Sequence, residues 1–267
     1  MKLANLLNGL VLLLASALGA VAFLSPFFVA GNAQANDGGV LAHAADAPLF
    51  LILLVIVCLG AVLVNLSAGT MTARTVAILG VLTAFSAVLR ALPGPGGFNA
   101  IFFIPLLAGY VYGATFGFLS GALAILVSAL LGGGVGPWLP FQMFATGWVG
   151  MLGAVLPRFR GKPLLEVVLL AAWGMVLGLL FGFIMNIWFW PFVMSPQQNE
   201  LYWQPGLSPW ATLQRYLVFY VATSLVWDLW RAAGNALLIV LFGVPVVRIL
   251  RRFQLRFRFE TQPNLPA

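Results

Sequence analysis

Residues 47–66 read APLFLILLVIVCLGAVLVNL, an unbroken run without a charged side chain. A helix of about 20 apolar residues is long enough to cross the hydrocarbon core of a bilayer. The whole 267-residue chain has this character, because 62% of its residues are hydrophobic and 7% are charged, whereas soluble domains carry about 25% charged residues. We therefore interpret the chain as an all-α integral membrane protein. The pattern excludes an ordinary soluble enzyme, a disordered chain and a membrane β-barrel.

Seven further apolar runs occur along the chain, at residues 3–30, 75–92, 98–112, 114–131, 139–156, 164–190 and 211–250. We expect a tight helical hairpin around Gly113 to Gly117, where glycines interrupt the short fourth run of the chain. The last run has 40 residues, which as a helix would reach about 60 Å, twice the hydrocarbon thickness. It therefore contains either two spans that turn near Arg231 to Gly234 or an outer helix that leads into one span.

The basic residues distinguish these alternatives, because cytoplasmic loops are enriched in Lys and Arg. The loops that contain Arg74 and residues 158–162 are expected inside, whereas loops 31–46 and 191–210 contain neither residue type and are expected outside. One final span then places the arginine-rich tail, which begins at Arg248, in the cytoplasm. We predict eight spans with both termini cytoplasmic, and residues 211–227 at the outer interface.

The polar linker at residues 31–46, together with residues 65–72, sets a two-span N-terminal extension apart from a six-span body. We predict a two-span N-terminal extension at residues 1–70, a six-span body at 71–252 and a basic cytoplasmic tail at 253–267. A cleaved signal peptide is an alternative for the first run, since Lys2 precedes it and Ala33 to Ala35 form a cleavage-type sequence. Its apolar core exceeds 25 residues, however, whereas signal peptides have about 7–15. A retained helix is therefore favoured.

Groups able to perform chemistry are scarce in the sequence. The one histidine, His43, has Asp46 nearby but lacks the further ligands that a metal site needs, so we expect a solvated loop side chain. No hydrolase elbow, zinc-protease motif or ATP-binding loop occurs. The net charge of +7 comes largely from clusters beside the spans. We predict no enzyme activity, no cofactor, no metal and no nucleic-acid partner.

Small residues follow a spacing of four along residues 73–91. The pairs Ala73/Ala77 and Gly80/Ala84 each fall on one helix face, which allows a second helix to approach closely. Two interpretations are open. The stripe packs inside its own bundle, or it is a docking face for a partner membrane protein.

The stretch GGGVGPWLPFQ at residues 132–142 connects two spans on the outer side. Glycine permits left-handed backbone and close approach of other groups, and the stretch delivers Trp138 and Gln142 to the start of the next span. A tight turn would explain the glycines alone. Contact with a ligand would also explain the tryptophan and the glutamine.

Other candidate binding residues are aromatic and polar side chains near the predicted outer ends of spans. Polar groups within spans are costly and are functional candidates by default. Asp228 and Arg231 lie three residues apart on one helix, so mutual neutralisation is an alternative role for them. The remaining candidates are Asn99, Asn186, Trp188, Trp190 and Asn235.

These features together resemble the substrate-binding S-component of energy-coupling-factor (ECF) vitamin transporters. The resemblance covers Met71 to Arg252. It rests on an alanine-rich helix that ends at Arg90, on FFIPLLAGYVYGATFGFLSG at 102–121, on GPWLPFQ at 136–142 followed by GWVG at 147–150, and on a closing helix with Asn235 and the arginines. The two extra N-terminal spans depart from the six-helix pattern of that family.

The resemblance implies a function in the cytoplasmic membrane of a prokaryote. Such a protein captures a vitamin-like micronutrient at the outer face and then associates with a membrane coupling protein and two cytoplasmic ATPases. The stripe Ala73, Ala77, Gly80 and Ala84 would contact the coupling protein, and the outer residues named above would bind the substrate. The many aromatic residues favour a ring-containing ligand, for example a corrinoid or a flavin.

An ion-coupled secondary transporter of a small organic solute is the second interpretation. Such carriers usually show an inverted repeat and carboxylates at membrane depth. Only Asp228 is available here, and it is expected near the outer end of its span.

Overall fold

The computed structural model describes residues 2–29, 42–91, 94, 98–159, 161–193 and 200–256. Several sequence predictions fall outside the described residues. These are the Ala33 to Ala35 cleavage-type sequence, most of the first outer linker and the tail beyond residue 256. Within the described residues the chain is helical and contains no strand, which agrees with the predicted fold class.

The helices follow the predicted apolar runs closely. They are α1 (Lys2–Val29), α2 (Ala47–Ser67), α3 (Ala73–Arg90), α4 (Phe103–Tyr112), α5 (Ala114–Ser128), α6 (Leu139–Leu152), α7 (Pro163–Phe189), α8 (Pro209–Thr223) and α9 (Leu225–Arg256). Short turns of tighter or wider helix adjoin them as η2 (Ala100–Phe102), η3 (Ala129–Gly133), η4 (Gly153–Val155) and η5 (Trp190–Phe192). Among the described residues, six helices are long and apolar enough to cross a membrane, and 100–112 and 139–155 form two shorter apolar helices.

Local sequence explains where several helices begin. The Thr72 hydroxyl accepts a hydrogen bond from the Thr75 amide at the start of α3, and Ser208 does the same for Ala211 at the start of α8. Proline occupies the first turn of α7 and α8, where no backbone donor is needed. Gly113 joins α4 to α5 with a φ of 107°, which a side chain would disfavour. The predicted hairpin at this glycine is therefore found.

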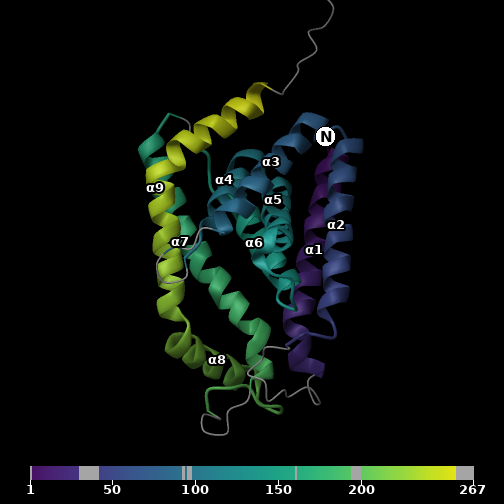
Figure 1. The fold of residues 1–267 in the computed structure, drawn as a ribbon, viewed down its shortest axis with the longest axis vertical. Helices are drawn as coiled ribbons and strands as arrows, with labels where there is room; N and C mark the ends of the chain where they lie inside the picture. Colours follow the sequence, from purple (N-terminus) through teal and green to yellow (C-terminus); the bar gives the residue numbers. More distant parts are fainter. Residues whose placement is uncertain are drawn as a thin grey trace, which may run out of the picture.

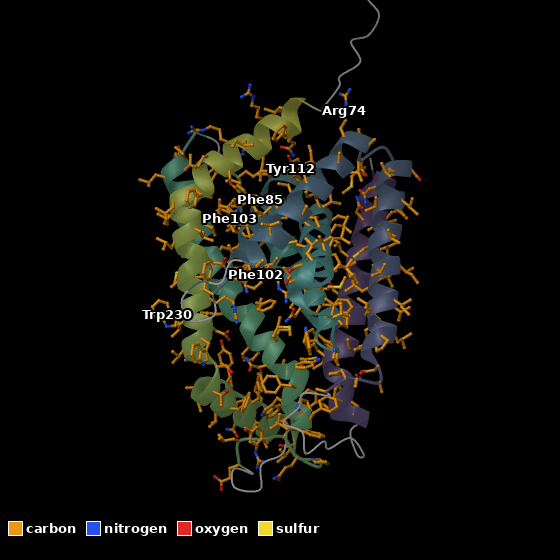
Figure 2. The ribbon with its side chains drawn as sticks, viewed as in Figure 1. Arg74, Phe85, Phe102, Phe103, Tyr112 and Trp230 are labelled. Carbon is orange, nitrogen blue, oxygen red and sulfur yellow. The ribbon has the colours of Figure 1, made fainter. Side chains whose placement is uncertain are left out.

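The bundle has two distinct ends (Figure 1). α8 lies across one end, which we call the α8 end, and α1 begins at the other. Figure 2 shows Arg74 at this other end, close to the end of α9, and we call it the basic end. α9 rises along the bundle and then turns across the basic end. Pro245 lies inside α9 and accounts for a bend, because proline removes one helical hydrogen bond.

The centre of the bundle is formed by α4, α5 and α6, which approach each other through glycine. A Cβ at Gly109 would lie 1.8 Å from the carbonyl oxygen of Gly150, and a Cβ at Gly117 would lie 2.2 Å from the same oxygen. The backbones can meet this closely only because these positions carry no side chain. The rest of the core is apolar, with Leu107, Leu119 and similar residues fully buried.

The α1–α2 hairpin packs against α6. The Trp148 indole donates to the Ser16 hydroxyl over 3.1 Å, and the rings of Phe23 and Phe141 lie 5.0 Å apart. Gly19 lies against the Trp148 ring, where a Cβ would come within 2.6 Å. The predicted N-terminal extension is thus in close contact with the six-helix body, although its status as a separate domain stays a prediction.

A polar cluster ties α4, α7 and α9 together at the basic end. Arg251 donates to both carboxylate oxygens of Glu166, over 2.5 and 3.0 Å. The Tyr110 hydroxyl also donates to Glu166. Arg158 donates to the carbonyls of Tyr110 and Val111 over 3.3 Å each, which satisfies the open end of α4.

We expect the Glu166→Ala variant to be less stable by about 1–2 kcal/mol. Removing one partner of a buried ion pair is more destabilising than this, but Arg251 is partly exposed and recovers solvent contact. Thermal unfolding of the protein in detergent measures the effect, with the exposed Glu200→Ala as control. Equal unfolding temperatures for both variants would show that the cluster contributes nothing to stability.

Candidate substrate-binding site

A cavity of about 380 Å³ opens near the α8 end, between the start of α6, the end of α7 and the start of α9. Six of the nine predicted binding residues line it: Trp138, Gln142, Asn186, Trp188, Asp228 and Arg231. The other lining residues are Gly182, Met185, Phe189, Ser224 and Trp227. The cavity therefore combines an aromatic wall with a polar side.

The polar side is built from α7 and α9. The Asn186 amide donates to the Gly182 carbonyl over 2.7 Å, and the Ser224 hydroxyl donates to the Asn186 carboxamide oxygen over 2.8 Å. Arg231 forms an ion pair with Asp228, and its guanidinium lies 5.3 Å from the Phe181 ring centroid. The mutual neutralisation that the sequence allowed is thus present, and both residues also face the cavity.

Asp228 retains an open acceptor despite this ion pair. Only 2% of the residue is exposed, and its Oδ2 atom has no hydrogen-bond partner. The carboxylate fits because of Gly182, where a Cβ would lie 1.8 Å from Oδ2. Buried polar atoms are nearly always paired in proteins, so an open carboxylate oxygen on a cavity wall is a candidate contact for a ligand that donates a hydrogen bond.

Tyr220 approaches the same carboxylate from α8. Burial raises the pKa of the Tyr220 phenol above its ordinary value, and the charge of Asp228 raises it further. The two groups do not meet hydrogen-bond geometry, and the Tyr220 hydroxyl is buried without a partner. The phenol therefore stays protonated and is a donor placed beside the Asp228 carboxylate.

The opposite side of the cavity depends on the glycine-rich loop. Gly132 and Gly134 have φ values of 112° and 86°, so the loop requires glycine at both positions. Gly136 leaves room for the Trp138 indole, since a Cβ there would come within 2.4 Å of that ring. Gln142 accepts a hydrogen bond from Arg90 over 2.7 Å. Sequence reasoning missed both this arginine and Gly182 as parts of the site.

The three remaining predicted residues do not line the cavity. Asn99 accepts from the Ile101 amide over 3.3 Å and so caps η2. The Trp190 indole donates to the Leu201 carbonyl over 3.0 Å inside a buried aromatic cluster with Tyr216. Asn235 is 1% exposed, and both polar atoms of its carboxamide are unpaired.

The prediction that His43 is solvated is wrong. His43 is 4% exposed and packs between the rings of Phe141 and Phe192, with centroid distances of 4.3 and 4.8 Å. Its Nδ1 atom lies 2.8 Å from an Asp46 carboxylate oxygen. The polar linker suggested exposure, but the turn folds back onto an aromatic surface that only the tertiary structure creates. Among the described residues, no group of His, Cys, Asp and Glu could hold a metal ion.

The small-residue stripe on α3 faces away from the bundle. Ala73, Ala77, Gly80 and Ala84 are exposed, and a Cβ at Gly80 would meet no atom within 4 Å. The opposite face of α3, with Leu79, Thr83 and Ala87, is buried. The stripe is therefore not used for packing within the described part of the chain. A larger cavity of about 1080 Å³ adjoins it at the basic end, lined among others by Ala73, Arg74 and Gln254.

The fold and the cavity define a multi-pass α-helical membrane protein with a ligand-sized site near one end. A family model for the substrate-specific component of ECF transporters matches residues 74–243. The match spans more than half of the 267 residues, and the chain belongs to this family. Comparisons with curated proteins and with solved structures gave no match. The family is one of transport components rather than enzymes, and it implies a small-molecule substrate and an ECF coupling and ATPase module.

Proposed function

We propose that this protein captures a ring-containing vitamin or related micronutrient at the outer face of a prokaryotic cytoplasmic membrane. It then delivers the substrate to the cytoplasm together with a membrane coupling protein and two ATPases. The observation that carries the proposal is the meeting of six predicted binding residues at one cavity in a chain of this family. The cavity residues Trp138, Gln142, Asn186, Trp188, Asp228 and Arg231 are the proposed substrate contacts.

The topology that supports this function is eight spans with cytoplasmic termini. Six helices among the described residues are long enough to cross a membrane, and the two shorter apolar helices would add two crossings. Arg74 and the end of α9 lie at the basic end (Figure 2), which would be cytoplasmic by the distribution of positive charge. The α8 end, with the 380 Å³ cavity, would then face outward. In this topology α8 would be the outer interfacial helix that the sequence suggested.

The volume of the cavity favours the smaller of the predicted ring-containing ligands. Ligand sites have volumes of about 300–1,000 Å³, and the 380 Å³ found here is near the lower limit. A single flat ring system such as a flavin suits this volume and the indoles of Trp138, Trp188 and Trp227. A corrinoid, which carries a macrocycle and a nucleotide loop, fits it less well.

Docking to the coupling protein is assigned to the exposed stripe on α3. Small residues at Ala73, Ala77, Gly80 and Ala84 would let a partner helix approach the backbone of α3 closely. The described residues include no helix that covers this face. Because the chain has no ATP-binding motif, the energy for transport must come from its partners.

We expect Trp138→Ala and Gln142→Ala each to weaken substrate binding by about tenfold, the loss that follows from removing one aromatic or hydrogen-bonding contact. Titration of the purified protein with riboflavin, followed by tryptophan fluorescence, measures the change. Trp210→Ala is the control, because Trp210 is exposed and lies outside the cavity. Weakening that is equal in all three variants would contradict the assignment of the cavity.

The alternative, an ion-coupled carrier, differs from an ATPase-dependent transporter in its energy source. Uptake of radiolabelled substrate is measured in cells that express the protein with and without the ECF ATPases. The proposal expects uptake to depend on the ATPases and to survive collapse of the ion gradients. Uptake that persists without the ATPases would support the carrier instead. The pairing of Asp228 with Arg231 makes that carboxylate a poor ion-coupling group.

A further inference from the structure

The turn that leads into α2 holds an unusual combination of features around His43. His43 adopts a φ of 59° and is the only non-glycine residue with positive φ among the described residues. Its imidazole is fully enclosed, and its Nε2 atom has no hydrogen-bond partner. Left-handed backbone and buried unpaired nitrogens are both unfavourable, and strained positions of this kind concentrate at functional sites.

Asp46 adds a third unfavourable feature. It occupies the N-cap position of α2, where an aspartate normally accepts a hydrogen bond from the helix backbone. Its side chain makes no such cap bond, and its carboxylate is directed to Nδ1 of His43 over 2.8 Å. A neutral imidazole in this pairing carries its proton on Nδ1, which leaves Nε2 as an acceptor. The turn thus gives up a helix cap to fix the tautomer and orientation of one buried ring.

The ring fixed in this way contacts the wall of the substrate cavity. His43 and Trp188 lie in near-parallel planes, 23° apart, with centroids separated by 6.5 Å. Phe141 joins them, 4.3 Å from His43 and 6.4 Å from Trp188. Trp188 lines the cavity, and its indole N–H is also buried without a partner. The imidazole is therefore one of three ring neighbours of the indole, beside Phe141 and Phe189.

We propose that the α1–α2 hairpin is a structural part of the substrate site, and that His43, held by Asp46, is a positioning residue that fixes the Trp188 indole on the cavity wall. The link to the substrate rests on the proposed function, whereas the coupling of His43 to Trp188 does not depend on it. The two N-terminal helices then complete the binding unit. They bring the His43 turn to the α8 end through the contacts of α1 and α2 with α6.

The single histidine of the chain allows a test that needs no ligand. Full-length protein in lipid nanodiscs is treated with diethyl pyrocarbonate, and carbethoxylation of His43 is followed by peptide mass spectrometry. We expect His43 in the wild type to react at least about tenfold more slowly than in the unfolded chain. In Trp188→Ala, His43 is expected to react nearly as fast as in the unfolded chain. Trp227→Ala, which alters the same cavity without a ring contact to His43, is expected to react like wild type. Wild-type reactivity equal to that of the unfolded chain, or no change in Trp188→Ala, would overturn the inference.

A second measurement tests the consequence for binding. The variant is His43→Asn. Asparagine tolerates left-handed backbone, so a change in affinity arises from loss of the imidazole ring and not from the backbone. We expect the dissociation constant for riboflavin to rise about tenfold while the melting temperature of the empty protein stays unchanged. Asp46→Asn, which retains an acceptor for Nδ1, should restore most of the affinity relative to Asp46→Ala.

The possible failures are distinguishable. Unchanged affinity in His43→Asn would refute the role of His43 while the proposed function stands. Parallel loss of affinity and melting temperature would also refute it, since the ring would then support the fold rather than the indole. If wild type fails to bind riboflavin, the proposed ligand class is wrong, and the carbethoxylation rates alone decide whether the His43 turn is coupled to Trp188.

Discussion

Gly182→Ala is expected to abolish substrate capture. The added methyl carbon would lie 1.8 Å from Oδ2 and 2.0 Å from Cγ of Asp228, far closer than atoms can approach. Asp228 is buried in a helix contact between α7 and α9, so its carboxylate cannot swing freely into solvent. The variant must displace the carboxylate, break its ion pair with Arg231 or separate the helices. We expect a loss of affinity of at least about a hundredfold, together with lower stability.

Two further variants distinguish an effect of Gly182→Ala on binding from an effect on stability. Gly60→Ala, in α2, is the matched control, because a Cβ there would meet no atom within 4 Å. The double variant Gly182→Ala with Asp228→Ala removes the carboxylate that the methyl group strikes. It is expected to recover the melting temperature without recovering riboflavin binding. A single Gly182→Ala variant that binds like wild type would show that the Asp228 pocket is not the substrate site.

Ala77→Leu is expected to stop transport while leaving capture intact. Ala77 lies at the centre of the exposed stripe on α3, more than one helical turn from either end of the helix. A leucine there would hold a partner helix away from the α3 backbone, and close helix contacts in membranes do not tolerate such bulk. Since Ala77 faces away from the bundle, the fold and the cavity should be unaffected.

Uptake and binding must be measured in the same variant. We expect substrate uptake to fall to the level of cells without the ATPases, while the affinity for riboflavin in detergent equals that of wild type. Val240→Leu is the control, because Val240 is exposed and lies on α9, away from the α3 stripe. Normal uptake in Ala77→Leu would remove the stripe from the docking surface. Loss of binding would instead place Ala77 within the capture step.

Much of the architecture follows from the sequence because a bilayer imposes strong constraints. Long apolar runs, the glycine turn at Gly113 and a separate helix near residues 211–227 all follow from helix length and the positions of charges. The observed α8, Pro209–Thr223, and the positive φ of Gly113 agree with these predictions. The eight-span topology itself stays a proposal, since the described residues supply six long helices and two short ones.

The site was partly predictable for a related reason. Polar residues such as Asp228 and Asn186 are rare in apolar helices, and rarity alone identifies them as candidates. Their neighbours carry no such signal. Gly182 resembles every other membrane-helix glycine until the carboxylate opposite it is seen. Asn99 caps η2 and does not line the cavity, and the sequence does not distinguish these roles because an N-cap and a ligand contact require the same side chain.

His43 shows the limit of composition-based reasoning. A histidine in a linker of small and polar residues is usually solvated, and the sequence contains no hint of the aromatic surface that encloses it. That surface is assembled from Phe141 on α6, Trp188 on α7 and Phe192 in η5. Only the arrangement of these three segments in space determines the burial of His43.

Substrate capture by this cavity is tested by native mass spectrometry of the protein purified alone in mild detergent from cells grown with a full complement of vitamins. We expect one small molecule bound per chain, released on denaturation, with the ultraviolet or visible absorbance of a ring system. We also expect the same preparation of Gly182→Ala to lack this molecule. A wild-type protein that carries no ligand and gains none on incubation with the vitamins would contradict the assignment of this cavity to substrate capture.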